Sequence, residues 1–518
     1  MNPGPRAHAL AAFAIVAAAL AAYANSFRAP FIFDDIASIV DNPTIRRLWP
    51  PGDALSPPKD FGFTVSGRPL LNLSFAINYA IGGLNVWSYH ALNLLIHTLA
   101  GLTLFGLVRR TLVRSQLSAL SSQLSFATAL LWTLHPLQTE SVTYTVQRAE
   151  SLMGLFFLAT LYGFVRSLDS AHPRRWQIFS VVACLLGVAT KEVIALAPIL
   201  VFLYDRTFVS GTLRAAWQRH RWHHLALFAT WIPLAFLLVS TGGNRGGTMG
   251  FGLGISWSGY WLTQFEAVYR YLQLSLWPHP LVFDYGKISA TALAALPFAL
   301  PVLALVALTL LALWRWPVAG FLGAWFFALL APTSIMPGTL QMIVEHRMYL
   351  PLAAVVAAAF ALAARYLSPR ALLALATALA LAAGLATAQR NALYRDEKSL
   401  WQQALVHRPA NARAHNNLGL ILYRENQLAP ALAHFRESLR LDPTVAQTHF
   451  NLGLALMKSG RTNEAVAPLQ EAVRILPYFF TAHLNLGLVL TQLGRAPEAL
   501  DHLATAVRYD PTPAEAHF

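Results

Sequence analysis

The stretch SYHALNLLIHTLAGLTLFGLVRRTLVR, residues 88–114, joins a long apolar run to a cluster of arginines. Its apolar part, 88–108, has roughly the 20 residues that an α-helix needs to cross the hydrocarbon core of a bilayer. Arginines that follow such a run are typical of the cytoplasmic end of a membrane helix. The stretch therefore predicts a membrane-spanning helix, and the same combination recurs along the chain.

The composition agrees with a membrane protein. Of 518 residues, 56% are hydrophobic and 12% are charged, whereas a soluble domain has about 25% charged residues. The formal net charge of +14 comes from short basic clusters between apolar runs, which is typical of cytoplasmic loops and argues against a nucleic-acid partner. Cys184, the single cysteine, lies in an apolar run, so no disulfide or cysteine-rich metal site is predicted. The excess of arginine over lysine and the abundant alanine favour a bacterial source.

Apolar runs predict eleven spanning helices, of which the first is an uncleaved helix rather than a signal peptide. They lie near 8–24, 88–108, 118–134, 149–167, 176–190, 192–206, 223–240, 292–314, 317–332, 348–366 and 370–388. The segment 258–277 is expected to lie in the membrane interface, because Glu266, Arg270 and Gln273 form one polar stripe on a helix with several aromatic residues. The basic clusters then share one side, which places the N-terminus in the cytoplasm and the C-terminus outside.

Four loops are expected on the outer face: 25–87, 135–148, 241–257 and 335–347. The Gly-rich loop 241–257 lacks the strand and the Gly-Lys-Ser/Thr of a phosphate-binding loop, so we expect a mobile loop near the substrate instead.

After residue 390 the sequence becomes periodic. Proline recurs every 34 residues, as do an Asn-Leu-Gly triplet and an alanine: Pro409, Pro443, Pro477 and Pro511; Asn417, Asn451 and Asn485; Ala431, Ala465 and Ala499. A period of 34 residues is that of tetratricopeptide (TPR) helix pairs. The sequence therefore predicts an all-α protein, with a polytopic membrane bundle over 1–390 and a TPR solenoid over 391–518. The solenoid has about three repeats, a capping helix at 396–409 and a further repeat that begins at Pro511.

Asp34 and Asp35 lie in the first outer loop, within FIFDDIASIVDNPTI (31–45). They are either a solvated helix cap or interface acids, or they are a catalytic pair. In such a pair one carboxylate is the general base for an alcohol, and the other orients the alcohol or accepts a hydrogen bond. The proximity of two like charges raises one pKa, which suits a base that works near neutral pH.

Further polar residues gather at the predicted outer ends of the spans. His90, Asn93 and His97 share one helix face and serve either interhelical hydrogen bonding or a substrate cavity; their spacing does not favour a metal site. His135, Glu140, Arg148 and Glu150 form either an ion-pair network or the wall of a reaction site. Lys191 and Glu192 fall in a very short outer hairpin. Glu345, His346 and Arg347 either bind a lipid phosphate, which suits the bidentate arginine, or extend to the lipid headgroups.

The motifs FIFDDIASIVDNPTI, GRPLLNLSFAINYAIGGLNVWSYHALNLLIHTL, LHPLQTESVTYTVQRAE, ATKEV, YLQLSLWPHPLVFDY and EHRMYLP, followed by TPR repeats, resemble the transmembrane-and-TPR O-mannosyltransferase-like family. That family belongs to the GT-C superfamily and is related to the protein O-mannosyltransferases. The resemblance implies a polyprenyl-phosphate sugar donor, inverting transfer on the outer face, and Asp34 as the base beside Asp35. The related enzymes carry Asp-Glu at this place, so the Asp-Asp pair leaves the handling of the acceptor open.

On this basis we predict a glycosyltransferase of the bacterial inner membrane whose repeats lie in the periplasm. Its donor phosphate is held near Arg347, His346, Arg148 or Lys191, and Glu140, His90, His97 and Arg68 line the acceptor cavity. The acceptor is a protein, glycan or lipid hydroxyl, the repeats bind a protein partner, and no cofactor or metal is indicated, although a divalent cation is compatible with the pattern. Two other classes remain: a transporter or flippase with a TPR arm, which broken helices in two equivalent halves would favour, and a non-catalytic assembly scaffold.

Overall fold

The computed structural model describes residues 5–58, 64–114, 118–241, 256–288, 290–337 and 342–509. These residues form helices, turns and irregular segments, with no strand among them. The chain divides into two compact units. We call residues 1–281 with 288–397 the membrane unit, and residues 282–287 with 398–518 the repeat unit.

The membrane unit contains fifteen α-helices among its described residues. They are α1 (Pro5–Tyr23), α2 (Pro69–Gly82), α3 (Val86–Val113), α4 (Ser121–Leu134), α5 (Thr139–Thr143), α6 (Arg148–Ser167), α7 (Pro173–Val188), α8 (Ala197–Asp205), α9 (Leu213–Ala229), α10 (Trp231–Ser240), α11 (Trp257–Leu276), α12 (Ala292–Arg315), α13 (Pro317–Ile335), α14 (Pro351–Ala363) and α15 (Pro369–Leu393).

Eight helical segments of the described residues are long and apolar enough to cross a membrane. They contain α1, α3, α6, α8, α9 with α10, α12, α13 and α15. The other three predicted spans coincide with the shorter helices α4, α7 and α14. The segment α11, predicted to lie in the interface, is helical over Trp257–Leu276 and is not among the eight candidates. The all-α membrane bundle predicted from the apolar runs is confirmed.

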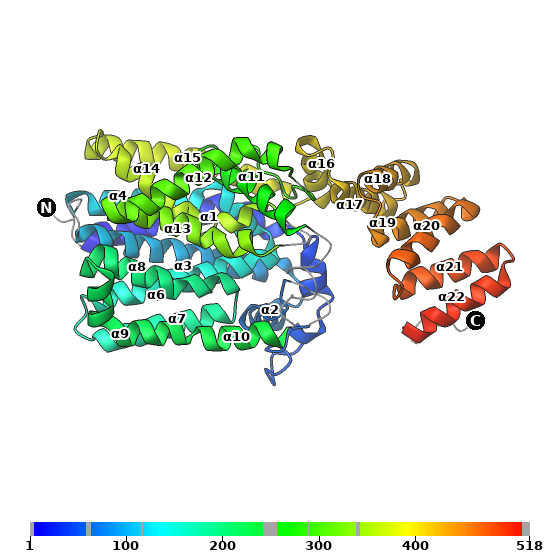
Figure 1. Ribbon diagram of the computed structural model, residues 1–518, viewed down its shortest axis with the longest axis horizontal. Helices are drawn as coiled ribbons and strands as arrows, with labels where there is room; N and C mark the ends of the chain where they lie inside the picture. The colour runs from blue at the N-terminus through cyan, green and yellow to red at the C-terminus, as the bar shows by residue number, and fades with distance from the viewer. Residues whose placement is uncertain are drawn as a thin grey trace. The chain divides into compact units, whose positions relative to one another are not determined.

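Within the membrane unit (Figure 1), α3 contacts α1, α4 and α6. One core forms where α1, α3, α4 and α15 meet, and it contains Ile15, Tyr23, Leu94, Leu134 and Ala380. Small residues allow close approach between the helices: a Cβ added to Gly163 of α6 would lie 3.0 Å from the Ser180 Cα of α7. Membrane helices commonly pack through such residues.

The repeat unit is a row of antiparallel helix pairs (Figure 1). Its helices are α16 (Glu397–His407), α17 (Ala412–Arg424), α18 (Leu428–Leu441), α19 (Ala446–Lys458), α20 (Thr462–Ile475), α21 (Phe480–Gln492) and α22 (Ala496–Tyr509). The glycine of each Asn-Leu-Gly triplet lies against the second helix of its pair, since a Cβ on Gly453 would meet the Leu469 Cγ at 2.6 Å. The repeat expected from Pro511 onward lies outside the described residues.

A short segment between α11 and α12 also belongs to the repeat unit. Its Asp284 accepts hydrogen bonds from Asn411 Nδ2 at 3.0 Å and from Arg413 Nη1 at 2.8 Å. Phe283 packs edge-on against Trp401, with ring centroids 5.2 Å apart. The repeat unit is therefore built from two separate parts of the sequence.

Candidate active site

The first loop places Asp34 and Asp35 on an irregular turn. Phe33, just before them, has φ of 46°, a left-handed conformation that is rare for a bulky residue and that occurs preferentially at functional sites. A single π-helical turn, Ile36–Val40, follows them, and such turns are also frequent at functional sites.

The two carboxylates have different environments. Asp35 is fully buried, and its Oδ1 accepts the Val146 N–H at 2.7 Å while its Oδ2 accepts the Ile32 N–H at 3.1 Å. Burial raises the pKa of the Asp35 carboxyl well above its usual range; the two backbone hydrogen bonds oppose this rise, and the charge of Asp34 adds to it. Asp34 is only half-buried. Asp35 therefore holds the loop, and Asp34 is the acid of the pair that retains exposure.

Tyr144 connects this turn to the next loop. Its hydroxyl accepts the Asp34 backbone N–H at 3.0 Å. Burial raises the pKa of Tyr144 well above its usual range, and the charges of Asp34 and Asp35 raise it further. Tyr144 is therefore a neutral phenol beside the acid pair.

The segment 135–148, which contains Tyr144, is buried along its whole length. Loops normally run over the protein surface, because their backbone polar groups need partners. Here Glu140 provides such a partner: its carboxylate accepts the backbone N–H of His346 at 2.9 Å and the Nδ1–H of the same residue at 2.8 Å. One buried segment thus joins the acid pair to the Glu-His-Arg sequence before α14.

His346 is uncharged at neutral pH. Burial lowers the pKa of His346 well below its usual range, the charge of Lys191 lowers it further, and Glu150 acts in the opposite direction. Because Nδ1 donates to Glu140, the neutral ring presents Nε2 toward Glu150, whose Oε1 lies 3.9 Å away.

Ion pairs continue from this point across the ends of α6, α7 and α8. The Lys191 ammonium pairs with the Glu150 carboxylate, and Arg68 Nη2 lies 3.6 Å from Glu192 Oε2. Burial lowers the pKa of Arg68 to about 10, with Glu150 opposing the change, so the guanidinium stays charged at neutral pH. The resulting charged cluster consists of three cations and three carboxylates around the neutral His346: Arg68, Lys191 and Arg347; Glu140, Glu150 and Glu192.

Arg347 is the half-buried cation of this cluster. Its Nη1 donates to the Met342 carbonyl at 3.0 Å, and its side chain lines a pocket with Glu150, Leu329 and Thr333. The pocket has a volume of about 10 Å³, which is room for about one water molecule. A larger ligand therefore requires the helices around it to open.

A second cavity, of about 150 Å³, lies between α3, α4, α6, α8, α13 and α14. Its wall is almost entirely apolar and includes Leu161, Phe321, Trp325 and Ala354. The helices α6, α13 and α14 contribute to both this cavity and the pocket at Arg347.

Arg148, a predicted phosphate ligand, has a different environment from Arg347. It is fully buried, stacks on Phe75 at 4.6 Å, and donates to Asn93 Oδ1 at 2.5 Å, to the Ser74 carbonyl at 3.1 Å and to the Tyr89 carbonyl at 3.0 Å. All three of its guanidinium nitrogens thus bind protein oxygens. The structure favours Arg148 as the residue that locks α6 onto α2 and α3, and not as a phosphate ligand.

The two predicted cavity histidines are also buried between helices. His90 Nε2 lies 2.9 Å from the Ala29 carbonyl. His97 donates from Nε2 to the Thr133 carbonyl at 2.9 Å and accepts the Tyr349 hydroxyl at Nδ1, also at 2.9 Å. Of the two roles considered for this helix face, the contacts favour interhelical hydrogen bonding.

Sequence reasoning missed Tyr144, whose residue type gave no signal of its role. It also missed a second polar group, Asp205 with His220 and His224, because residues 205–221 had the composition of a basic loop. The mobile loop expected at 241–257 falls almost entirely outside the described residues, since 242–255 are not described.

Comparison with known proteins gives two family matches in the repeat unit. A TPR repeat model matches residues 419–460, and a tetratricopeptide repeat model matches residues 450–516. The predicted TPR solenoid is confirmed.

Curated relatives match a longer part of the chain. Human TMTC3 is 33% identical over 184 residues, which is 34% of this chain and 19% of that protein. Mouse TMTC1 is 34% identical over 166 residues (31% and 17%), and human TMTC2 is 31% identical over 243 residues (44% and 28%). All three are named protein O-mannosyl-transferases. The resemblance inferred from the motifs is confirmed, and the match spans about a fifth of the length of the first two relatives.

Among solved structures, ArnT from Cupriavidus metallidurans bound to undecaprenyl phosphate is similar over 88% of this chain and 79% of its own, with 17% identity and a TM-score of 0.42. The crystal structure of MamA is similar over 23% of this chain and 71% of its own, with 21% identity and a TM-score of 0.23. Both TM-scores lie below 0.5 and describe a loose likeness.

Proposed function

We propose that the protein is a membrane glycosyltransferase that moves a sugar from a polyprenyl-phosphate donor to a hydroxyl group of a protein or glycan. Transfer occurs on the outer face of a bacterial inner membrane. The N-terminus lies in the cytoplasm, and the repeats bind a protein partner in the periplasm. The names of the curated relatives support mannose as the sugar and a protein as the acceptor.

The observation that carries this proposal is the division of roles within the acid pair. Both oxygens of Asp35 are occupied by backbone N–H groups in a buried position, whereas Asp34 is half-buried on the same turn. A neighbouring pair in different environments suits one structural acid and one general base. Asp34 is therefore our candidate for the base.

We place the donor phosphate beside Arg347 of the charged cluster. A half-buried arginine next to a small pocket can form a bidentate contact with a phosphate once the pocket opens. Lys191 supports it indirectly, because its ammonium pairs with the Glu150 carboxylate that lines the same pocket and so offsets that negative charge. His346 is neutral and gives its Nδ1–H to Glu140, so it adds no positive charge there. The apolar cavity between α6, α13 and α14 can take part of a polyprenyl chain, because its wall offers almost no polar surface.

The reaction is a single displacement. The acceptor oxygen attacks the anomeric carbon and its proton passes to Asp34, while the bond between the anomeric carbon and the phosphate oxygen breaks. The departing lipid phosphate keeps the electron pair, and the charge of Arg347 stabilises it. One displacement inverts the configuration at the anomeric carbon.

Sugar transfer by the purified chain tests this proposal. The assay follows radiolabelled mannose from a synthetic polyprenyl-phosphate mannose to a mixture of serine- and threonine-containing proteins. We expect Asp34→Asn to lower kcat by about 10²- to 10⁴-fold with little change in donor binding, as for the loss of a general base. Arg347→Ala should raise KM for the donor as well as lower kcat.

Asp41→Asn is the matched control, because Asp41 is an exposed acid on the same loop, and it should retain activity within about twofold of the wild type. Absence of transfer by the wild-type chain, with transport of the lipid-linked sugar instead, would favour a flippase. Absence of both would favour a scaffold. Normal kcat in Asp34→Asn would remove Asp34 as the base.

A further inference from the structure

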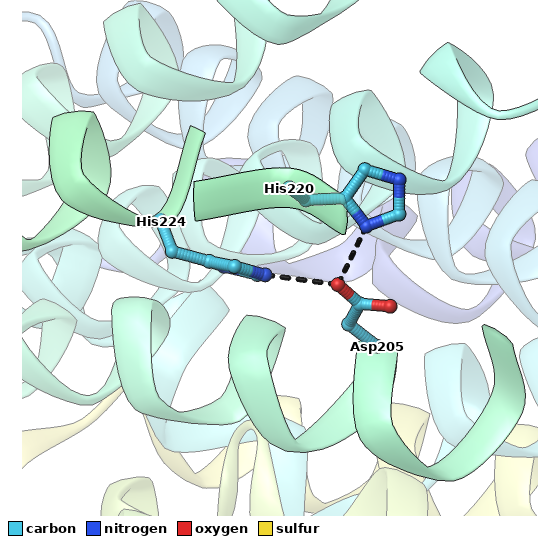
Figure 2. A group of neighbouring side chains, drawn as sticks. All are labelled: Asp205, His220 and His224. Atoms are coloured by element: carbon cyan, nitrogen blue, oxygen red, sulfur yellow. Dashed lines mark hydrogen bonds and ion pairs between the residues drawn. The ribbon is translucent and has the colours of Figure 1, made fainter. Parts of the chain in front are cut away.

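A second polar group lies on the far side of the membrane unit from the acid pair. Asp205 ends α8, and His220 and His224 lie one turn apart on α9 (Figure 2). Phe164 of α6 contacts the rings of both histidines, with centroid distances of 5.4 and 5.9 Å. Since Phe164 lies 14 residues beyond Glu150, the group is roughly 20 Å along α6 from the charged cluster.

The three side chains converge on one point. Asp205 Oδ2 lies 2.7 Å from His220 Nδ1 and 2.9 Å from His224 Nε2. All three ligand atoms lie within 4.8 Å of one another, and Figure 2 shows both imidazole nitrogens directed at the same carboxylate oxygen. The other carboxylate oxygen, Oδ1, accepts the Ser210 hydroxyl at 2.7 Å, which fixes the orientation of the carboxylate.

Two departures from regular helix build this arrangement. A π-helical turn, Arg206–Ser210, directly follows Asp205 and brings the Ser210 hydroxyl back to it. On α9 the backbone leaves the helical region at His220, with φ of −125° and ψ of 23°. Irregularities of this kind are frequent at functional sites.

Two of the three side chains are shut off from solvent, and the third is slightly exposed. The side chains of Asp205 and His224 are fully buried, while that of His220 is 13% exposed. Phe202 covers the His224 ring edge-on at 4.9 Å. A buried carboxylate needs compensating positive charge, and the exposed edge at His220 gives a path for an ion and for a water ligand.

We propose that Asp205, His220 and His224 bind a divalent transition-metal ion of the Zn²⁺ class. Two histidines at i and i+4 on one helix face are a frequent zinc-binding arrangement. Two imidazoles and one carboxylate, with a water as fourth ligand, match the preference of Zn²⁺ for nitrogen and oxygen donors. The ion joins the π turn after α8 to α9, and Ser210 supports the carboxylate from outside the ligand set.

The geometry requires only a small adjustment for this ion. Tetrahedral Zn²⁺ with bonds of about 2.0–2.1 Å separates its ligand atoms by roughly 3.3 Å. The two Asp205 contacts would lengthen by roughly half an ångström. His220 can move in this way because it lies at the kink of α9.

His223 is a matched control on the same helix. It is adjacent to His224 in sequence, but its Nε2 lies 3.4 Å from Ser180 Oγ and its ring stacks on Phe164. His223 therefore belongs to the same aromatic surroundings without pointing at Asp205.

The test uses the full chain, purified in detergent through a tag without histidine, stripped with a chelator and dialysed against Zn²⁺. Elemental analysis should find about one more zinc per chain in the wild type and in His223→Gln than in Asp205→Asn or His224→Gln. Bound Co²⁺ should give the visible absorption bands of a tetrahedral site in the first two proteins only. Loss of a ligand should lower Zn²⁺ affinity more than about 100-fold, and Ser210→Ala should lower it by about 10- to 100-fold, the usual range for a supporting residue.

A comparison of thermal stability guards against misfolded variants. Zn²⁺ should raise the Tm of the wild type and of His223→Gln, and leave the Tm of a folded Asp205→Asn protein unchanged. Equal zinc content in the wild type and Asp205→Asn would overturn the proposal. So would a wild type that binds no zinc, in which case the group is a hydrogen-bonded Asp-His-His cluster only.

Discussion

The contacts of His135, a buried residue in the segment 135–148, depend on its protonation state. Its Nδ1 accepts the Leu137 N–H at 3.3 Å, which only a neutral ring can do, and it caps the short helical turn Pro136–Gln138. Burial lowers the pKa of His135 to about 4, while a hydrogen bond to the Ser275 backbone acts in the opposite direction. Protonation of this residue therefore competes with folding of the segment that connects the acid pair to the charged cluster.

The sign of the resulting pH dependence follows from proton binding. An unfolded histidine has a pKa near 6.5, so between about pH 4 and pH 6.5 the unfolded chain binds more protons at residue 135 than the folded chain. The free energy of unfolding thus falls as the pH drops through this window, by on the order of 1 kcal/mol per pH unit.

We predict that His135→Asn reduces this loss, because asparagine can cap the same turn but does not titrate. The measurement is the thermal midpoint in detergent at pH 7.5 and pH 5.0, and the wild type should lose more than the variant between the two. Other buried histidines titrate equally in both proteins, so the difference isolates residue 135. An identical loss in both would mean that His135 does not set the acid sensitivity.

At the scale of the element, close helix pairing in the repeats depends on one glycine per pair. A Cβ on Gly419, Gly453 or Gly487 would lie 2.8, 2.6 or 2.6 Å from the side chain of Phe435, Leu469 or Leu503. These distances are below normal contact, so each first helix needs glycine where the second helix crosses it.

We predict that Gly453→Ala lowers the free energy of unfolding of the repeat unit by about 1–3 kcal/mol through overpacking. Leu469→Ala alone should cost about 2–5 kcal/mol because it leaves a cavity. The double variant should be less destabilised than the sum of the two, because alanine at 469 makes room for the new methyl group. Urea unfolding of the four proteins measures this coupling, and strict additivity would contradict the contact.

The sequence predicts elements well and individual contacts poorly. Apolar length located a helix at each of the eleven predicted spans, eight of which lie in segments long and apolar enough to cross a membrane. The 34-residue period located the repeats, because both patterns report on the burial of whole helix faces. The acid pair was found because two adjacent carboxylates are conspicuous after an apolar run. The burial of Arg148 was not predictable, because its partners come from α2 and α3, which are distant in sequence. An arginine at the end of a membrane helix looks the same in the sequence whether it is buried among helices or binds a phosphate. The kink at His220 was not predictable either, because no Pro or Gly lies at that position.

At the scale of the whole molecule, the repeat unit includes a segment that precedes its helices by more than a hundred residues. Residues 282–286 are buried, and Arg408 stacks on Tyr285 at 5.2 Å while Asp284 binds Asn411 and Arg413. A fragment that begins at residue 398 therefore lacks part of its own core.

We predict that fusing residues 281–288 to residue 398 through a Gly/Ser linker of about ten residues, which spans roughly 17 Å, stabilises the isolated repeats. Burial of the Phe283 side chain alone is worth about 1.5–3 kcal/mol, so Tm should rise by at least about 5 °C. Asp284→Ala should remove part of this gain.

Lys287→Ala is the control for the fusion, because its side chain is 50% exposed and pairs with Asp442 at 3.5 Å. It should change Tm by no more than about 1 °C. Equal Tm values for the fused and unfused fragments would show that the segment contributes nothing to the repeats.

The divided repeat unit also sets an order of events during synthesis. The ribosome makes residues 282–287 first and then α12, α13, α14 and α15, and only afterwards the helices that complete the unit. Domains that are continuous in sequence can fold as soon as they emerge, but this one must wait until four further helices have been made. The aromatic and acidic side chains of the early segment therefore lack their partners for that interval. They are covered by α16 and α17 only after the helices in between have been made.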